Sequence, residues 1–152
     1  MREKQKVKHL YGVFEAQFRR FFAEAERVRG VTGATLLSML ERRLDNVVYR
    51  LGFASSRTQG RQMVRHSLVT INGHKVNIPS YQVKVGDIVS LKEKQQKSEL
   101  VADNLQGAAR RGVPSWLELN TKAFKGTVKA LPNRDEITLP IQEQLIVELY
   151  SK

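Results

Sequence analysis

Three arginines recur at intervals of four residues in the segment 55–73, SSRTQGRQMVRHSLVTING. In a helix, residues four apart lie one above the other, so Arg57, Arg61 and Arg65 would share one face. Planar guanidinium groups in such a row suit phosphate binding, and their mutual repulsion favours an anion opposite them. A solvated helix face is the alternative, and for three arginines alone the two hypotheses are about equally supported. The opposite side of the helix would offer apolar residues to a core, namely Met63, Val64 and Leu68.

The same segment carries local signals for a helix start and for a β-hairpin. Ser56 and Gln59 have the S-x-x-Q spacing of a capping box, which satisfies two backbone donors at a helix N-terminus. Beyond the helix, apolar residues alternate with a period of two on both sides of Asn72-Gly73: Val69, Ile71, Val76 and Ile78. Asn-Gly between alternating apolar residues is a strong signal for a hairpin turn. We therefore predict a basic helix that leads directly into a hairpin.

The net charge indicates a polyanionic partner. Of 152 residues, 26 are Lys or Arg and 15 are Asp or Glu, which gives a formal charge of +11. Residues 1–75 hold 15 basic and 6 acidic side chains, whereas residues 76–152 hold 11 and 9. A membrane surface is the competing polyanion, but no apolar run approaches the roughly 20 residues of a spanning helix. No lipidation signal or secretory signal peptide is visible, so we expect a nucleic-acid partner and no membrane.

Little in the sequence points to catalysis or to a cofactor. The three histidines lie on separate segments, without the i, i+4 spacing of a helical metal pair: His9, His66 and His74. The chain has no cysteine, which excludes disulfides and thiolate metal ligands and fits a reducing cytosol. Asp45 is expected to orient Arg42 and Arg43, not to act as an acid or base. We therefore predict that the protein is not an enzyme and has no cofactor or metal site.

Two helical patterns with largely basic polar positions fill the N-terminal third of the chain. Apolar residues at spacings of three and four predict one long amphipathic helix over residues 7–28, ending at Gly30, with its aromatics, Phe14 included, in a core. A second helix is predicted over residues 36–51, with Gly52 as a left-handed stop. The basic residues of these helices are candidate nucleic-acid contacts: Lys6, Lys8, Arg19, Arg20, Arg27, Arg29, Arg42, Arg43 and Arg50.

The rest of the chain combines short strands with two further helices. The alternating segments predict strands at 81–85, 88–91, 116–119 and 127–131. Between them, a helix capped by Ser98 is expected to end near Gly112, and Trp116 is expected to pack in a core. A last short helix is predicted to begin at Pro140.

The predicted fold class is α+β. A C-terminal helix of about ten residues is marginal alone, so its apolar face should pack on the first helical layer. The middle of the chain would then be an insertion of helices packed on a small, mainly antiparallel sheet. We expect residues 1–43 to form the first part of a helical domain, 44–131 the inserted module, and 132–152 the helix that returns to the helical domain.

Four strings carry a resemblance to a known family: ERRLDNVVYRLG from residue 41, FASSRTQGRQMVRH from 53, VNIPSYQVKVGD from 76 and LIVELYSK from 145. Over residues 2–152 the chain resembles the bacterial small-subunit ribosomal protein four family. The resemblance implies that the middle module binds RNA, at a multi-helix junction in the 5′ domain of small-subunit ribosomal RNA, early in assembly. It further implies a cytoplasmic place on the ribosome near the mRNA entry path, beside neighbouring small-subunit ribosomal proteins, and in some members repression of their own mRNA.

Carried over to this sequence, the resemblance implies an RNA surface on the basic helix and the hairpin: Arg57, Gln59, Arg61, Arg65, His66, Asn72, Gly73 and Lys75. Its cations would displace counterions while the helix and hairpin recognise RNA shape. The family usually has a further N-terminal segment, in some members with zinc-binding cysteines. This chain begins at Met1 directly before REKQKV, which suggests a chain shortened at its N-terminus.

Two alternatives to a ribosomal protein remain open at this point. The module also occurs in RNA-modifying or ligating enzymes, but the module and its helical flanks leave no room here for a catalytic domain. A ribosome-associated stress or rescue protein can consist of the module alone, whereas this chain has additional helices on both sides of it.

For His66, simple exposure and a phosphate or base contact are equally supported.

Overall fold

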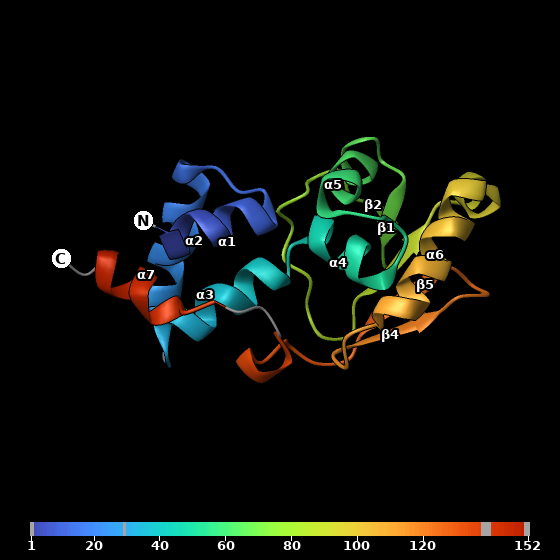
Figure 1. Cartoon of the computed structure of the whole chain (residues 1–152). Coiled ribbons are helices and arrows are strands. Elements are labelled where there is room, and N and C mark those ends of the chain that lie inside the picture. Colours follow the sequence, from blue (N-terminus) through green and yellow to red (C-terminus); the bar gives the residue numbers. More distant parts are fainter. Residues whose placement is uncertain (1, 29, 138–140, 151–152) are drawn as a thin grey trace. The chain divides into compact units, whose positions relative to one another are not determined.

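The computed structural model describes residues 2–28, 30–137 and 141–150 (Figure 1). Within these ranges the fold is α+β, as predicted, with α-helices and a five-stranded antiparallel sheet. The chain divides into two compact units: one joins the N-terminal part up to Glu41 with the C-terminal part from Pro132, and the other runs from Arg42 to Leu131. In the described ranges, no helix is long and apolar enough to cross a membrane, and no group of three His, Cys, Asp or Glu residues could hold a metal ion.

The first unit is helical and draws its elements from both ends of the chain (Figure 1). They are α1 (Arg2–Tyr11), α2 (Glu15–Arg27), α3 (Thr32–Glu41), the 3-10 helix η2 (Arg134–Glu136) and α7 (Glu143–Tyr150). Helix α7 packs on α1 and α3. The core is apolar and rich in aromatics: Val7, Tyr11, Val13, Phe18, Phe22, Ala25, Leu36, Leu37, Leu40, Ile137, Ile141 and Ile146. The predicted helix start at Pro140 lies outside the described residues.

The prediction of one long N-terminal helix is wrong, because the chain turns between α1 and α2. Gly12 has a φ of +66°, in the left-handed region that favours glycine. The N–H of Val13 donates to the carbonyl of Lys8 at 3.0 Å, the 6→1 bond of a Schellman motif. After this turn Phe14 takes an extended conformation and is 79% exposed, so its predicted place in the core is also wrong.

The second unit places helices against one sheet. Its helices are α4 (Leu44–Leu51), α5 (Arg57–Arg65), the 3-10 helix η1 (Glu93–Lys97) and α6 (Glu99–Arg111). The predicted helix over residues 36–51 is therefore two helices, α3 and α4. Arg43 interrupts it, because its extended backbone (φ −62°, ψ 140°) is the N-cap of α4 and forms a bridge with Gln82. The predicted stop at Gly52 is confirmed, with a φ of +93°.

The sheet is antiparallel throughout, in the order β2-β1-β3-β5-β4. Its strands are β1 (Val69–Ile71), β2 (His74–Lys75), β3 (Ile88–Leu91), β4 (Leu117–Asn120) and β5 (Lys125–Val128). The predicted hairpin is confirmed: Asn72 and Gly73 both have positive φ, 51° and 84°, as a type I′ turn requires. The predicted strand over residues 81–85 is wrong, since only the isolated bridge at Gln82 forms there.

Two glycines let the elements of the second unit approach closely. A Cβ at Gly60 in α5 would collide with the backbone carbonyl of Asp45 in α4, and a Cβ at Gly126 in β5 would collide with the Leu51 side chain. Helix α4 therefore lies tightly between α5 and the sheet. Trp116 is 1% exposed in the same core, which confirms its predicted packing role.

Helix α6 begins and ends near its predicted bounds. Ser98 occupies the N-cap position, but its side chain makes no capping hydrogen bond, so that part of the prediction is wrong. The helix is held instead by Asn104, whose Nδ2 donates to the Phe53 carbonyl and to Gln59 Oε1, each at 2.9 Å. Asn104 thus connects α6 with the segment that begins α5.

Candidate nucleic-acid interface

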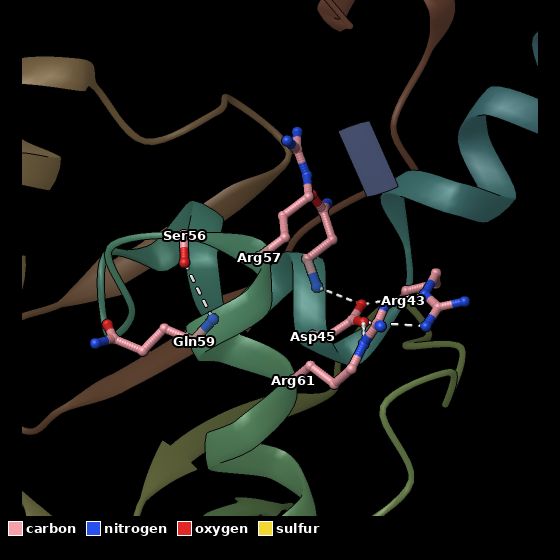
Figure 2. Close-up of polar contacts among 7 residues, drawn as sticks. Arg43, Asp45, Ser56, Arg57, Gln59 and Arg61 are labelled. Atoms are coloured by element: carbon pink, nitrogen blue, oxygen red, sulfur yellow. Dashed lines mark hydrogen bonds and ion pairs between the residues drawn. The ribbon is translucent and has the colours of Figure 1, made fainter. Parts of the chain in front are cut away.

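Helix α5 starts at the predicted cap. The Gln59 N–H donates to Ser56 Oγ at 3.0 Å (Figure 2). The return bond differs from a standard capping box, because Gln59 Oε1 accepts from the Ser55 N–H, at 2.6 Å. The same oxygen also accepts from Asn104. Gln59, predicted as an RNA contact, is therefore engaged on its oxygen in holding the helix start.

A buried carboxylate lies beneath the arginines of the second unit. Asp45 is 1% exposed and accepts two hydrogen bonds from Arg43, Nε to Oδ1 at 3.1 Å and Nη2 to Oδ2 at 3.0 Å. Arg61 Nε approaches Oδ2 from α5 at 3.5 Å, and the Asn46 N–H donates to Oδ1 at 2.7 Å. Figure 2 shows the Asp45 carboxylate between the guanidinium groups of Arg43 and Arg61. One carboxylate thus holds the side chains of Arg43, which precedes α4, and of Arg61 in α5, together with the backbone N–H of Asn46 in α4.

The prediction that Asp45 orients both preceding arginines holds for Arg43 and is wrong for Arg42. Arg42 Nε donates instead to the Val83 carbonyl, at 3.1 Å. Burial lowers the pKa of the Arg42 guanidinium below its ordinary value. Arg43 is only 2% exposed, because its guanidinium is turned inward onto Asp45. Arg43 therefore lies in the interior of this unit and not on its surface.

The three arginines of α5 have different surroundings. Arg57 Nε donates to Asn46 Oδ1 at 2.8 Å, and its guanidinium carbon lies 5.0 Å from the centroid of the Tyr49 ring. Arg61 is turned onto Asp45, with 22% of its side chain exposed, and Arg65 is exposed. The expected repulsion along this row is therefore offset from within the fold, because Asp45 supplies a negative charge and α4 supplies an amide and a ring.

The hairpin turn is tied to the loop before β3. Asn72 Nδ2 donates to Asp87 Oδ1 at 3.0 Å, and Asn72 Oδ1 accepts from the Ile88 N–H at 2.9 Å. Asp87 Oδ2 accepts from the Lys84 N–H at 2.9 Å. The other predicted contacts of this region are all exposed. They are His66 at the end of α5, and Gly73 and Lys75 on the hairpin.

The predicted contacts of the first unit lie on α1 and α2, near acidic partners. Glu15 is approached by three cations: Lys4, which hydrogen-bonds to Oε1, Lys8 at 3.5 Å and Arg19 at 3.7 Å. The hydrogen bond from Lys4 lowers the pKa of Glu15. Burial by itself would lower the pKa of Lys4. The net change is a raised pKa, to which the hydrogen bond with Glu15 contributes. The remaining predicted contacts, Lys6, Arg20 and Arg27, are all exposed. Two of them pair with acids, Lys6 with Glu3 and Arg27 with Glu24. Arg29 lies outside the described residues.

Sequence reasoning missed two residues of the second unit, Tyr49 and Arg111. Arg111, at the end of α6, donates from Nη2 to the Tyr49 carbonyl at 2.9 Å, and its guanidinium carbon lies 4.3 Å from the Tyr49 ring centroid. Arg50 also lies over this ring, at 5.6 Å. The basic pair Arg110-Arg111 at a predicted helix end was the available signal for Arg111. Nothing in the sequence indicated which side chain it would meet.

The sequence of the second unit identifies the class of protein, because it matches the S4 domain. The family model described as "S4 domain" matches residues 42–89, and the one described as "Ribosomal protein S4/S9 N-terminal domain" matches residues 1–41. The small ribosomal subunit protein uS4 of Desulforapulum autotrophicum is 64% identical over all 152 residues of this chain, which cover 73% of that relative. The uS4 proteins of Pelobacter propionicus and Geobacter sulfurreducens are 63% and 62% identical over the same length and also 73% covered. The chain belongs to the family of small ribosomal subunit protein uS4.

Proposed function

We propose that this chain binds small-subunit ribosomal RNA through α4, α5 and the β1–β2 hairpin. The observation that carries the proposal is Asp45, a carboxylate that is 1% exposed and that holds Arg61 of α5 in place. A buried charge is unfavourable unless it is paired and hydrogen-bonded. A fold that keeps such a charge beneath surface arginines favours a preorganised anion-binding surface, for which guanidinium groups are well suited.

The proposed interface consists of residues that reach the surface of the second unit. Its members are Arg42, Arg50, Arg57, Arg61, Arg65, His66, Gly73 and Lys75. Gln59 holds the helix start and Asn72 holds the hairpin turn. We assign positioning roles to these two residues and also to Arg43. In the first unit, the proposed contacts are Lys6, Lys8, Arg19, Arg20 and Arg27. Arg29 stays a prediction.

The physical basis of binding is the same for all the Arg and Lys residues of the proposed interface. Cations that neutralise phosphates release condensed counterions, which supplies affinity without sequence preference. Specificity then comes from the shape of folded RNA, which the helix and hairpin present to a complementary surface. We propose that the target is a multi-helix junction in the 5′ domain of the small-subunit RNA, in the cytoplasm. There the chain would help to nucleate assembly beside neighbouring ribosomal proteins, with residues 44–131 as a module inserted in a helical domain.

Two other functions are less well supported. The similarity to uS4 proteins extends over the whole chain, α1 to α3 and α7 included, which favours a ribosomal protein over a stress or rescue module or an accessory domain of an RNA-modifying enzyme. The uS4 relatives bear the name of a ribosomal subunit protein and not of an enzyme. Binding of its own mRNA, which the family resemblance implies for some members, stays a prediction.

Salt dependence tests the proposal most directly. We expect affinity for a 5′-domain RNA fragment to fall roughly a thousandfold or more between about 50 and 200 mM salt, as for six to ten phosphate contacts. A plain RNA duplex of equal length should bind more weakly at both salt concentrations, because it lacks the junction. Equal affinity for the two RNAs, or a nearly flat salt dependence, would contradict the proposal.

Neutralising α5 tests where the RNA binds. Replacing Arg57, Arg61 and Arg65 by glutamine should weaken binding more than replacing the three exposed lysines of the β4–β5 region, which removes the same charge: Lys122, Lys125 and Lys129. Fluorescence of Trp116, the chain's single tryptophan, reports whether each variant is folded. If folded variants of both kinds lose equal affinity, only overall charge matters and α5 is not the interface.

A further inference from the structure

Tyr49, near the C-terminal end of α4, is surrounded by guanidinium groups from three helices. The guanidinium carbons of Arg111, Arg57 and Arg50 lie 4.3, 5.0 and 5.6 Å from the centroid of its ring. Each distance is within the roughly 6 Å over which a cation and an aromatic face attract each other. The ring is therefore a shared platform for positive charges carried by α4, α5 and α6.

Close packing of α6 on the end of α4 places Arg111 at this ring. A Cβ at Gly52, the residue that ends α4, would collide with the side chain of Ala108, which is buried. Arg111 lies three residues after Ala108, on the same side of α6. Its Nη2 donates to the Tyr49 carbonyl at 2.9 Å. The guanidinium group is thus fixed by backbone and ring while the residue remains exposed.

The three charges are close enough to act on a single ligand. Since their guanidinium carbons lie no more than 5.6 Å from one centroid, any two of them are at most about 11 Å apart. This is close to the Debye length of about 10 Å at 0.1 M salt, so dissolved ions screen their repulsion incompletely. An aromatic ring attracts cations but does not neutralise them. Guanidinium forks match the oxygens of phosphate, so a phosphate among them would receive charge-assisted hydrogen bonds from more than one helix.

We propose that Arg50, Arg57 and Arg111 form a phosphate-binding site around Tyr49, which takes the RNA backbone and extends the interface onto α6. Arg111 is a phosphate contact in this site, and Tyr49 is a positioning residue that orients the guanidinium groups. The site rests on the proposed function, because its ligand is a phosphate of the same RNA.

The neighbouring Arg110 offers a matched control. It carries the same charge on the same helix and is also exposed, but it is rotated by about 100° from Arg111 around the helix axis. Arg111→Gln should weaken binding of a 5′-domain RNA fragment by about tenfold or more. It should also reduce the slope of log affinity against log salt by about one phosphate contact. Arg110→Gln should change affinity by less than about threefold, as expected for a screened distant charge.

Two further pairs separate charge from geometry. Arg111→Lys should restore the salt slope but only part of the affinity, because lysine keeps the charge without the planar fork. Tyr49→Phe keeps the ring and should bind like the parent, whereas Tyr49→Leu should bind more weakly. Equal binding by Tyr49→Phe and Tyr49→Leu would overturn the positioning role of the ring.

The outcomes distinguish this site from the interface as a whole. If Arg111→Gln binds like Arg110→Gln while Arg57→Gln loses affinity, the site on α6 is refuted and the interface on α5 stands. If the parent chain binds no RNA, the proposed function fails and this site fails with it. If Arg111→Gln lowers the melting temperature but leaves the affinity of the folded protein unchanged, Arg111 has only a structural role and the proposal is overturned.

Discussion

Replacing Asp45 by asparagine should destabilise the second unit and misplace the arginines above it. Asp45 accepts two hydrogen bonds from Arg43, and both side chains are almost completely buried. Removing one partner of a buried ion pair costs about 3–5 kcal/mol, because the other charge stays buried without its counter-charge. Asparagine keeps one oxygen that can accept from Arg43. We therefore expect the lower end of this range, about 3 kcal/mol in the free energy of unfolding.

Urea unfolding followed by Trp116 fluorescence measures this loss, because the single tryptophan lies in the core of the same unit. Arg61→Gln is the matched control: it removes the partly exposed side of the same network, and should cost about 1 kcal/mol or less. A loss below about 1 kcal/mol for Asp45→Asn would refute the stabilising role of this pair.

RNA binding by Asp45→Asn separates orientation from net charge. The substitution makes the chain more positive, so charge alone predicts tighter binding. If Asp45 holds Arg61 in a binding geometry, the folded variant should instead bind a 5′-domain fragment more weakly than the parent. Tighter binding at a temperature where the variant is folded would show that Asp45 only neutralises the surface, and would contradict a preorganised interface.

Four other perturbations test the packing and electrostatics of the two units. Gly60→Ala should destabilise the second unit by about 1–3 kcal/mol through overpacking against α4. Gly107→Ala, where the new methyl group meets nothing within 4 Å, should stabilise α6 by up to about 1 kcal/mol. Urea unfolding followed by Trp116 fluorescence measures the change in stability of both glycine variants. The hydrogen bond from Lys4 holds the pKa of Glu15 below its ordinary value of 4.5. This stabilisation is therefore complete above pH 4.5 and is lost as the pH falls through the folded pKa. Hydrogen-exchange protection of α1 and α2 should thus fall on acidification in the parent, and to a smaller extent in Glu15→Gln. Deleting α7 should reduce protection in α1 and α3 more than in the sheet, and an equal loss in both units would contradict the packing described here.

Features that depend on a few neighbouring residues could be predicted from the sequence. The hairpin follows from Asn72-Gly73, because these residue types tolerate the positive φ that a type I′ turn requires. Gly52 ends α4, and Ser56 starts α5, for similarly local reasons. The concentration of positive charge in the first half of the chain is a property of composition, and it led to a nucleic acid as the expected partner.

Breaks within a continuous apolar pattern could not be predicted in this way. The spacing of apolar residues continues past Gly12 and past Arg43, so the pattern indicated one helix where the structure has two. A helix can continue through one glycine or one arginine at modest cost. Whether it does depends on the packing of the flanking helices, and that packing is a property of the tertiary structure.

The sequence by itself determined the basic helix, its cap, the hairpin and the family. Tertiary structure alone decided which side chains meet: Asp45 and Arg61 are 16 residues apart, and Tyr49 and Arg111 are 62 apart. These contacts exist because α5 and α6 dock closely on α4, where Gly60 and Gly52 leave no side chain in the way. Docking also buried Arg43, which sequence alone could not tell apart from its exposed neighbours. Charge and local conformation follow from nearby residues, whereas burial and pairing depend on elements that are distant in the chain.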